Sequence, residues 1–137
     1  MSPQILLRAA ALLMLLHAIG HSFGMAGWRK ATDPKKLEVV NQMTQNKFPF
    51  MGVSRSMANY YEGFGHAATI SILLIVALLW LVSGETANGG TLAVKILWPV
   101  AIFCLLLGID ELIYFFPMAA AFSILSGILT LVAIFRF

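Results

Sequence analysis

Residues 94–137 form one apolar tract of 44 residues, and this tract sets the strongest limit on the fold. A helix that spans a membrane needs about 20 mostly apolar residues. The tract is therefore too long for one such helix and suits two. It is interrupted by Asp110 and Glu111 and then by Pro117, which suits the first turn of a new helix because a missing N–H costs nothing there. We place the two spans at about residues 93–112 and 115–136.

Two further apolar segments, at about 4–26 and 63–84, are each long enough to cross a membrane. Of the 137 residues, 60% are hydrophobic and only 11% are charged, whereas a soluble domain carries about 25% charged residues. The length leaves room for a single domain, 1–137. The composition excludes a soluble enzyme, a nucleic-acid-binding module and a disordered tail. We therefore expect an all-α integral membrane four-helix bundle.

The link between the first two spans, residues 27–62, is long and partly structured. Asp33 and Pro34 have the pattern of an N-cap followed by the first residue of a helix. Apolar residues then recur at helical spacing, which predicts an amphipathic helix near 34–46 at the membrane surface. The apolar segment 48–53, FPFMGV, is expected to dip into the interface. The link forms a lid over the bundle in this interpretation.

The other links are short, and basic residues predict the orientation. Residues 85–92, ETANGGTL, read as a polar turn. An even number of spans places both termini on one side of the membrane. The positive-inside rule then predicts a cytoplasmic large link and external termini. The first span also has features of a secretory signal, but we expect it to be retained. The basic residues of the large link are Arg29, Lys30, Lys35, Lys36, Lys47 and Arg55.

Ionisable residues inside the spans are few, and such residues are costly and usually functional. Consecutive spans run in opposite directions, so the end of the first span, the start of the second and the end of the third lie at one membrane face. Six ionisable residues fall in these three places, whereas Arg8, Lys95 and Arg136 lie near the other face. We therefore expect one His and carboxylate site near that face. Its members are His17, His21, Glu62, His66, Asp110 and Glu111.

Helical spacing predicts which of these residues face the same way. His17 and His21 are four residues apart and share a helix face. Glu62 and His66 share a face if the second span begins by residue 62. Asp110 and its neighbour point about 100° apart, so only one of the two faces the bundle. Gly20, Gly24, Gly63 and Gly65 predict close helix contacts beside these groups.

Acid–base chemistry on a lipophilic small molecule is the first chemistry that such a set predicts. A carboxylate and an imidazole shielded from water can move protons on a bound molecule. We assign the catalytic role to Glu62, His66 and His21. The binding role falls to Asp110, Glu111, His17, Tyr61 and Tyr114, although the tyrosines and Trp28 also fit an interfacial aromatic belt.

Two cofactor sites are open alternatives. His-xxx-His and Glu-xxx-His pairs on facing helices supply metal ligands. The spacing of these residues therefore allows a divalent metal site formed by His17, His21, Glu62 and His66. The other alternative is a haem group with His66 and either His17 or His21 as its axial ligands. Cys104 is the single cysteine, which excludes an intrachain disulfide and a cysteine-based metal site.

A packing network is the non-enzymatic alternative. In it, Glu62 or Asp110 pairs with His21 or His66 across the helix contacts and only fixes the bundle. The chain would then be a structural or accessory subunit, working as a homo-oligomer or with a partner protein rather than through a site of its own.

Three segments resemble a family of small bacterial four-span membrane proteins that is DoxX-like in architecture. They are HAIGHSFG at 17–24, FMGVSRS at 50–56 and YYEGFG at 60–65. The resemblance implies a multi-pass protein of the bacterial inner membrane. It also implies, for some members, a role as a small partner of quinone-linked oxidoreductases.

Overall fold

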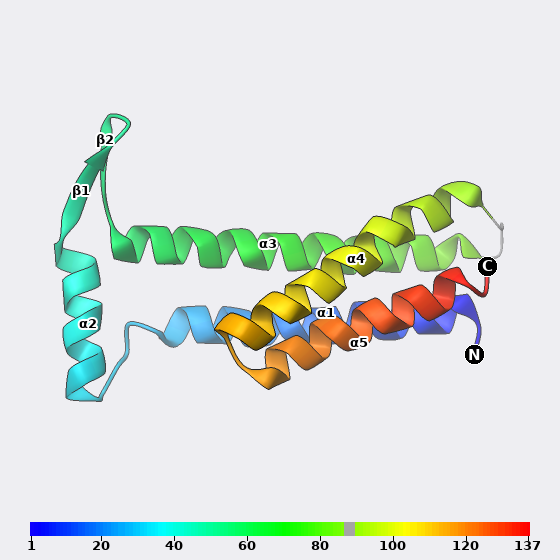
Figure 1. Cartoon of the computed structure of the whole chain (residues 1–137), viewed down its shortest axis with the longest axis horizontal. Helices are drawn as coiled ribbons and strands as arrows, with labels where there is room; N and C mark the ends of the chain where they lie inside the picture. The colour runs from blue at the N-terminus through cyan, green and yellow to red at the C-terminus, as the bar shows by residue number, and fades with distance from the viewer. Residues whose placement is uncertain (87–89) are drawn as a thin grey trace. The chain divides into compact units, whose positions relative to one another are not determined.

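The computed structural model describes residues 1–86 and 90–137, and within them the fold is helical (Figure 1). Four of the helices are long and apolar enough to cross a membrane. The chain is therefore a multi-pass membrane protein, and the predicted helical membrane bundle is confirmed. The four helices are α1 (Pro3–Gly27), α3 (Met57–Gly84), α4 (Thr91–Tyr114) and α5 (Pro117–Ile134).

The helix boundaries follow the predicted spans closely, with one informative exception. Pro117 lies in the first turn of α5, as expected. Helix α3, however, begins at Met57 rather than near residue 63. Its start is fixed by a reciprocal pair of hydrogen bonds, because Ser56 N donates to Asn59 Oδ1 at 3.0 Å and Asn59 N donates to Ser56 Oγ at 3.3 Å. Glu62 therefore lies inside the helix, four residues before His66.

The link between α1 and α3 contains a helix and a β-hairpin. Helix α2 (Pro34–Gln45) begins where predicted, and Asp33 accepts a hydrogen bond from Lys36 N at 3.0 Å. Strands β1 (Lys47–Phe50) and β2 (Val53–Ser56) pair antiparallel in the segment expected to dip into the interface. The predicted polar turn 85–92 lies partly outside the described residues, which exclude 87–89.

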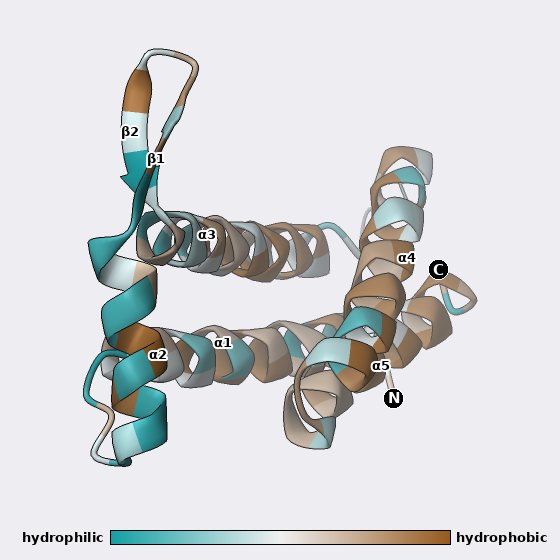
Figure 2. Cartoon of the chain, turned by 60° about the vertical axis from the view of Figure 1, so that its left-hand side comes forward, coloured by the Kyte–Doolittle hydropathy of each residue, from teal (hydrophilic) through white to brown (hydrophobic). Residues whose placement is uncertain are grey.

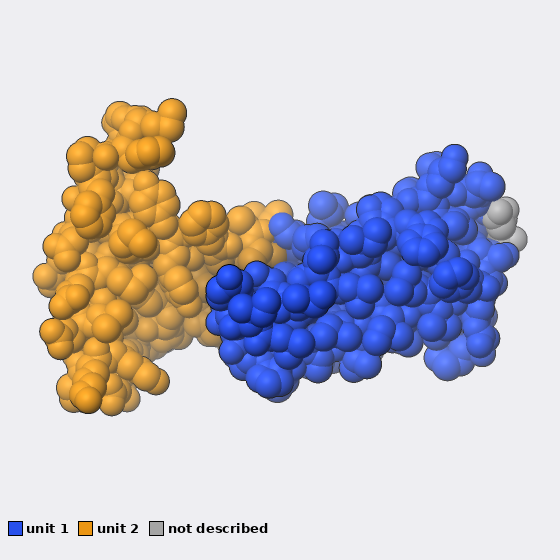
Figure 3. Space-filling model, viewed as in Figure 1, with its two compact units in different colours: residues 1–18, 71–137 blue, residues 19–70 orange. Residues whose placement is uncertain are grey.

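The chain forms two compact units (Figure 3). Unit 1 consists of residues 1–18 and 71–137, and unit 2 of residues 19–70. Unit 1 holds the apolar core, to which α1, α3, α4 and α5 all contribute. Its fully buried larger side chains are Leu7, Met14, Leu79, Leu97 and Cys104.

Unit 2 combines the end of α1, the start of α3 and the link between them. Figures 1 and 2 show α2 and the hairpin running crosswise to the start of α3. In Figure 2 the long helices are mostly hydrophobic, whereas α2 carries hydrophilic residues beside a short hydrophobic stretch. An amphipathic helix set crosswise to a membrane-spanning helix fits the membrane surface, as the sequence predicts.

Candidate functional site

Unit 1 contains a buried pair of ionisable side chains, His17 on α1 and Glu111 on α4. His17 Nε2 lies 3.0 Å from Glu111 Oε1, and each residue is 5% exposed. The other ring nitrogen, Nδ1, lies 3.2 Å from Ser123 Oγ on α5. Three helices are therefore joined through one imidazole.

Both ring nitrogens of His17 have a protein partner, but one carboxylate oxygen of Glu111 has none among the described residues. Glu111 Oε2 is buried and accepts no hydrogen bond within the described residues. Asp110, the next residue along the chain, is exposed. The prediction that only one of these two acidic residues faces the bundle is confirmed. The described contacts of His17, Glu111 and Ser123 fit a helix-packing network.

Unit 2 contains all three predicted catalytic residues, and Glu62 accepts three side-chain hydrogen bonds there. Arg29 donates two hydrogen bonds to it, from Nε to Oε1 at 2.7 Å and from Nη2 to Oε2 at 2.9 Å. Trp28 Nε1 donates a third, to Oε1 at 3.2 Å. Both carboxylate oxygens are thus occupied. Glu62 holds the segment that follows α1 against the start of α3.

Arg29 and Trp28 support each other in this arrangement. The Arg29 guanidinium lies over the Trp28 ring, 5.2 Å from its centroid. The hydrogen bond to Glu62 raises the pKa of Arg29 further above its ordinary value, against the opposing effect of desolvation. Arg29 therefore stays charged at every working pH, and the two-point contact persists wherever the carboxylate is ionised.

His21 joins α1 to α3 in unit 2. Its Nε2 is 3.0 Å from the carbonyl oxygen of Gly65, which also accepts a hydrogen bond from Thr69 Oγ1 at 3.1 Å. A carbonyl only accepts, so His21 Nε2 carries the proton. A Cβ at Gly65 would collide with the Met25 side chain. These atoms belong to the end of a flexible side chain and not to the backbone of α1, so the close helix contact predicted at Gly65 stays a prediction.

A small pocket brings two of the predicted catalytic residues together. It has a volume of about 210 Å³. Glu62 and His66 both line it, one turn apart on α3, and the His66 residue is exposed. The prediction that these two share a face is confirmed. The other lining residues are Ser22, Met25, Ala26 and Thr69.

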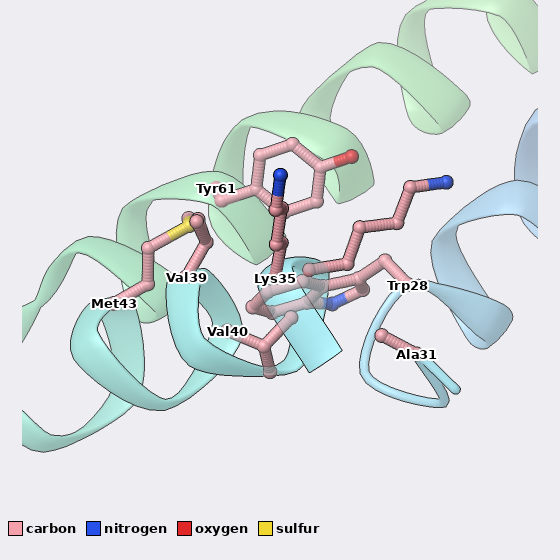
Figure 4. Close-up of a pocket in the computed structure, with 8 residues that line it drawn as sticks. Trp28, Ala31, Lys35, Val39, Val40, Met43 and Tyr61 are labelled. Atoms are coloured by element: carbon pink, nitrogen blue, oxygen red, sulfur yellow. The ribbon is translucent and has the colours of Figure 1, made fainter. Parts of the chain in front are cut away.

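A larger pocket of about 440 Å³, here called the Trp28 pocket, lies between α2, the Trp28 segment and α3 (Figure 4). The rings of Trp28 and Tyr61 contact each other, with centroids 4.9 Å apart. Lys35 and Lys36 come from the first turn of α2 and bring positive charge to the lining. The remaining lining residues are Ala31, Val39, Val40 and Met43.

Replacing Glu62 with alanine is expected to release the Trp28 indole. The substitution removes the acceptor of the Trp28 N–H and both acceptors of Arg29, so the ring becomes more mobile and wetter. In a Trp80→Phe/Trp98→Phe background, Trp28 emission should shift to longer wavelength and become more accessible to acrylamide. Glu38→Ala, which removes the same charge from exposed α2, is the matched control and should leave the spectrum unchanged. An unchanged spectrum in Glu62→Ala would contradict the positioning role.

The remaining predicted residues do not join these groups. Tyr114 is exposed at the end of α4. Within residues 1–86 and 90–137, no three His, Cys, Asp or Glu side chains lie together in a way suited to a metal ion. The predicted metal set of His17, His21, Glu62 and His66 therefore does not gather into one group there.

Sequence reasoning missed Ser123 and Arg29, and it counted Lys35 and Lys36 only for membrane orientation. Ser123 gave no signal, because one serine in an apolar helix is common and its partner comes from a distant segment. Arg29 was counted only for membrane orientation, although it follows directly after the first span.

Comparison of the chain with protein-family models, curated proteins and solved structures gave no match in any of the three.

Proposed function

We propose that this membrane protein binds a lipophilic small molecule with an anionic head group, and that the Trp28 pocket is its site. The supporting observation is the composition of the lining. Trp28, Tyr61 and the aliphatic side chains of α2 offer an apolar wall, and Lys35 and Lys36 offer two cations. The apolar wall would contact the hydrocarbon part of the ligand, and the two lysines would bind its anionic head group. A volume of about 440 Å³ lies in the range of small-molecule sites.

The position of the pocket along the chain supports this choice of ligand. The first span ends at Gly27, directly before Trp28, and Tyr61 lies near the start of the α3 span. The pocket therefore belongs to the level at which the chain leaves the membrane, where tryptophan and tyrosine are favoured. An amphiphile dissolved in the bilayer holds its head group at the same level and would enter sideways.

The small pocket adds a group for acid–base chemistry. Glu62 is held by Arg29 and contributes by fixing Trp28. His66, the other titratable residue of the small pocket, would be the acid–base group for a molecule that reaches this pocket, which shares no lining residue with the Trp28 pocket.

The test uses Trp28 as the reporter of its own pocket. The Trp80→Phe/Trp98→Phe variant, in phosphatidylcholine nanodiscs, is titrated with dibrominated stearic acid, whose bromine atoms quench indole fluorescence on contact. Saturable quenching is expected. Lys35→Glu/Lys36→Glu should raise the apparent Kd at least roughly thirtyfold, since each lysine near an anionic group is worth about 1 kcal/mol and about 1.4 kcal/mol corresponds to a factor of ten.

Two controls separate pocket binding from partition into the lipid. Lys47→Glu changes charge in the same unit but outside the pocket lining, so it should leave the Kd unchanged. Brominated phosphatidylglycerol, built into the disc, tests whether a bilayer lipid is the ligand instead of a free acid. Linear quenching without saturation, equal in all variants, would refute the proposal.

We further propose that the membrane is the bacterial inner membrane and that the protein is DoxX-like. The four spans support this proposal, together with the resemblance of residues 17–24, 50–56 and 60–65 to that group. The basic residues of the link support a cytoplasmic location for unit 2's extramembrane part.

An accessory subunit of a quinone-linked redox complex is the second candidate. The observation that favours it is the buried pair in unit 1, where His17, Glu111 and Ser123 use one another as partners. The chain alone would then bind no amphiphile saturably, and a purified quinone-linked oxidoreductase would form a defined complex with it. Saturable binding by the isolated chain would argue against this candidate.

A further inference from the structure

The hairpin of β1 and β2 has a tightly specified tip. Residues directly opposite each other are Phe50 and Val53, so the loop consists of Met51 and Gly52 alone. Both have positive φ angles, 48° and 82°. This is the conformation of a two-residue hairpin turn whose twist matches that of its strands. The tip therefore holds its side chains in fixed directions.

The register gives the hairpin one apolar and one polar face. Opposite residues share a face, and successive residues of a strand alternate. Phe48 pairs with Arg55, and Phe50 pairs with Val53, so these four side chains lie together. The opposite face carries Lys47, Pro49, Ser54 and Ser56.

The apolar face and the tip are uncovered within the described residues. Phe50 is 61% exposed and Met51 is 87% exposed. Phe48 and Val53 are also exposed. A lone two-stranded hairpin is marginally stable in water. Burial of this face in an apolar environment would therefore stabilise the hairpin.

The attachment of the hairpin to α3 identifies that environment. Ser56, the last residue of β2, caps α3, and no linker separates the hairpin from this membrane-spanning helix. The hairpin runs crosswise to α3 (Figure 1). A rigid element that leaves a spanning helix crosswise at its first residue lies along the membrane surface.

We propose that Phe48, Phe50, Met51 and Val53 insert into the boundary between head groups and acyl chains of the bilayer that α3 crosses. Arg55, on the same face, reaches lipid phosphates with its stem in the apolar layer. Lys47 adds a second positive charge toward anionic lipids. This interaction is independent of the ligand proposed for the Trp28 pocket.

Site-specific fluorescence labels test the insertion. Cys104 is replaced by alanine, and Met51→Cys and Ser54→Cys variants of the full chain are labelled with the environment-sensitive dye NBD. Liposomes contain phosphatidylcholine and phosphatidylglycerol, with or without a lipid spin-labelled near its head group. The label at 51 should emit at shorter wavelength and lose most of its fluorescence to the spin-labelled lipid. The label at 54 should instead be quenched by aqueous iodide.

A label at Phe50→Cys repeats the measurement on the strand, in case the label at 51 disturbs the turn. Circular dichroism verifies the helical fold of each variant. Iodide quenching of 50 and 51 without an effect of spin-labelled lipid would overturn the proposal. Shielding of 54 together with 50 and 51 would overturn the one-sided orientation.

Discussion

Replacing Glu111 with alanine is expected to lower the free energy of unfolding by roughly 3 kcal/mol, because removing one partner of a buried hydrogen-bonded pair leaves the other unsatisfied. His17 is 5% exposed and would lose the acceptor that lies 3.0 Å from its Nε2. No water in the membrane replaces it. Unfolding in mixed micelles of dodecyl sulfate and a mild detergent, followed by circular dichroism, measures the change.

Because one oxygen of Glu111 has no hydrogen-bond partner among the described residues, a variant that replaces both Glu111 and His17 should lose little stability, unlike the single variants. Glu111 Oε2 has no hydrogen-bond partner in the part of the chain that the structure describes, and such an atom costs about 1–3 kcal/mol. His17→Leu/Glu111→Leu removes both the pair and this penalty. The double variant should therefore be much closer to the wild type than either single variant.

Asp110→Ala is the matched control for this cycle. It removes the same kind of charge from the adjacent, exposed position, and its effect should stay within about 0.5 kcal/mol. Single variants as stable as this control would refute the buried pair as a packing element. A double variant as unstable as the singles would refute the penalty assigned to Oε2.

The spans were predictable from the sequence because membrane thickness dictates their length. Pro117 marked the start of α5 correctly. The start of α3 was placed too late, because Met57 to Glu62 are not strongly apolar and the cap depends on the Ser56–Asn59 hydrogen bonds. Side-chain capping decides a helix boundary more finely than hydropathy does.

The hairpin escaped prediction as a hairpin. Its turn uses Met51 before Gly52 rather than the usual asparagine or aspartate. Its strands have four residues each, and β1 includes Pro49. The apolar character of 48–53 was readable, but the pairing that gives it two faces was not.

The candidate site was predictable in its members but not in its pairs. Sequence spacing correctly placed Glu62 and His66 on one face and showed that only one of Asp110 and Glu111 faces inward. It could not show that Arg29 donates hydrogen bonds to the Glu62 carboxylate, because Arg29 lies in a loop, where no periodicity indicates its partner. Trp28 and the predicted apolar stripe of α2 proved to line one pocket.

Glycines show the same limit, because close packing depends on the facing helix. Gly20 and Gly24 were expected to permit a close contact, and this prediction is wrong, since no atom lies within 4 Å of the position of a Cβ on either. The close approach in unit 1 occurs instead at Gly108 and Gly127, between α4 and α5. Gly127 does follow Ala119 and Ser123 at four-residue spacing, a small-residue pattern that the sequence analysis did not use.

Replacing Gly108 with leucine is expected to destabilise the packing of α4 on α5 by roughly 3 kcal/mol, the upper range for overfilling a packed contact. A Cβ there would lie 2.5 Å from Ile124 Cγ1, 3.1 Å from Ile124 N and 3.2 Å from Ala120 O. A change of the Ile124 rotamer can relieve the shortest of these contacts, but the other two atoms belong to the backbone of α5 and stay tight. The helices must move apart, and the loss is measurable by the same micelle unfolding.

Gly24→Leu is the matched control, because nothing lies within 4 Å of its Cβ position and leucine favours the helix by about 1 kcal/mol over glycine. It should be neutral or slightly stabilising, so the two variants change stability in opposite directions. Gly108→Ala should fall between them, since its Cβ meets the same atoms with no further bulk. A Gly108→Leu variant as stable as Gly24→Leu would mean that α4 and α5 do not meet at this residue.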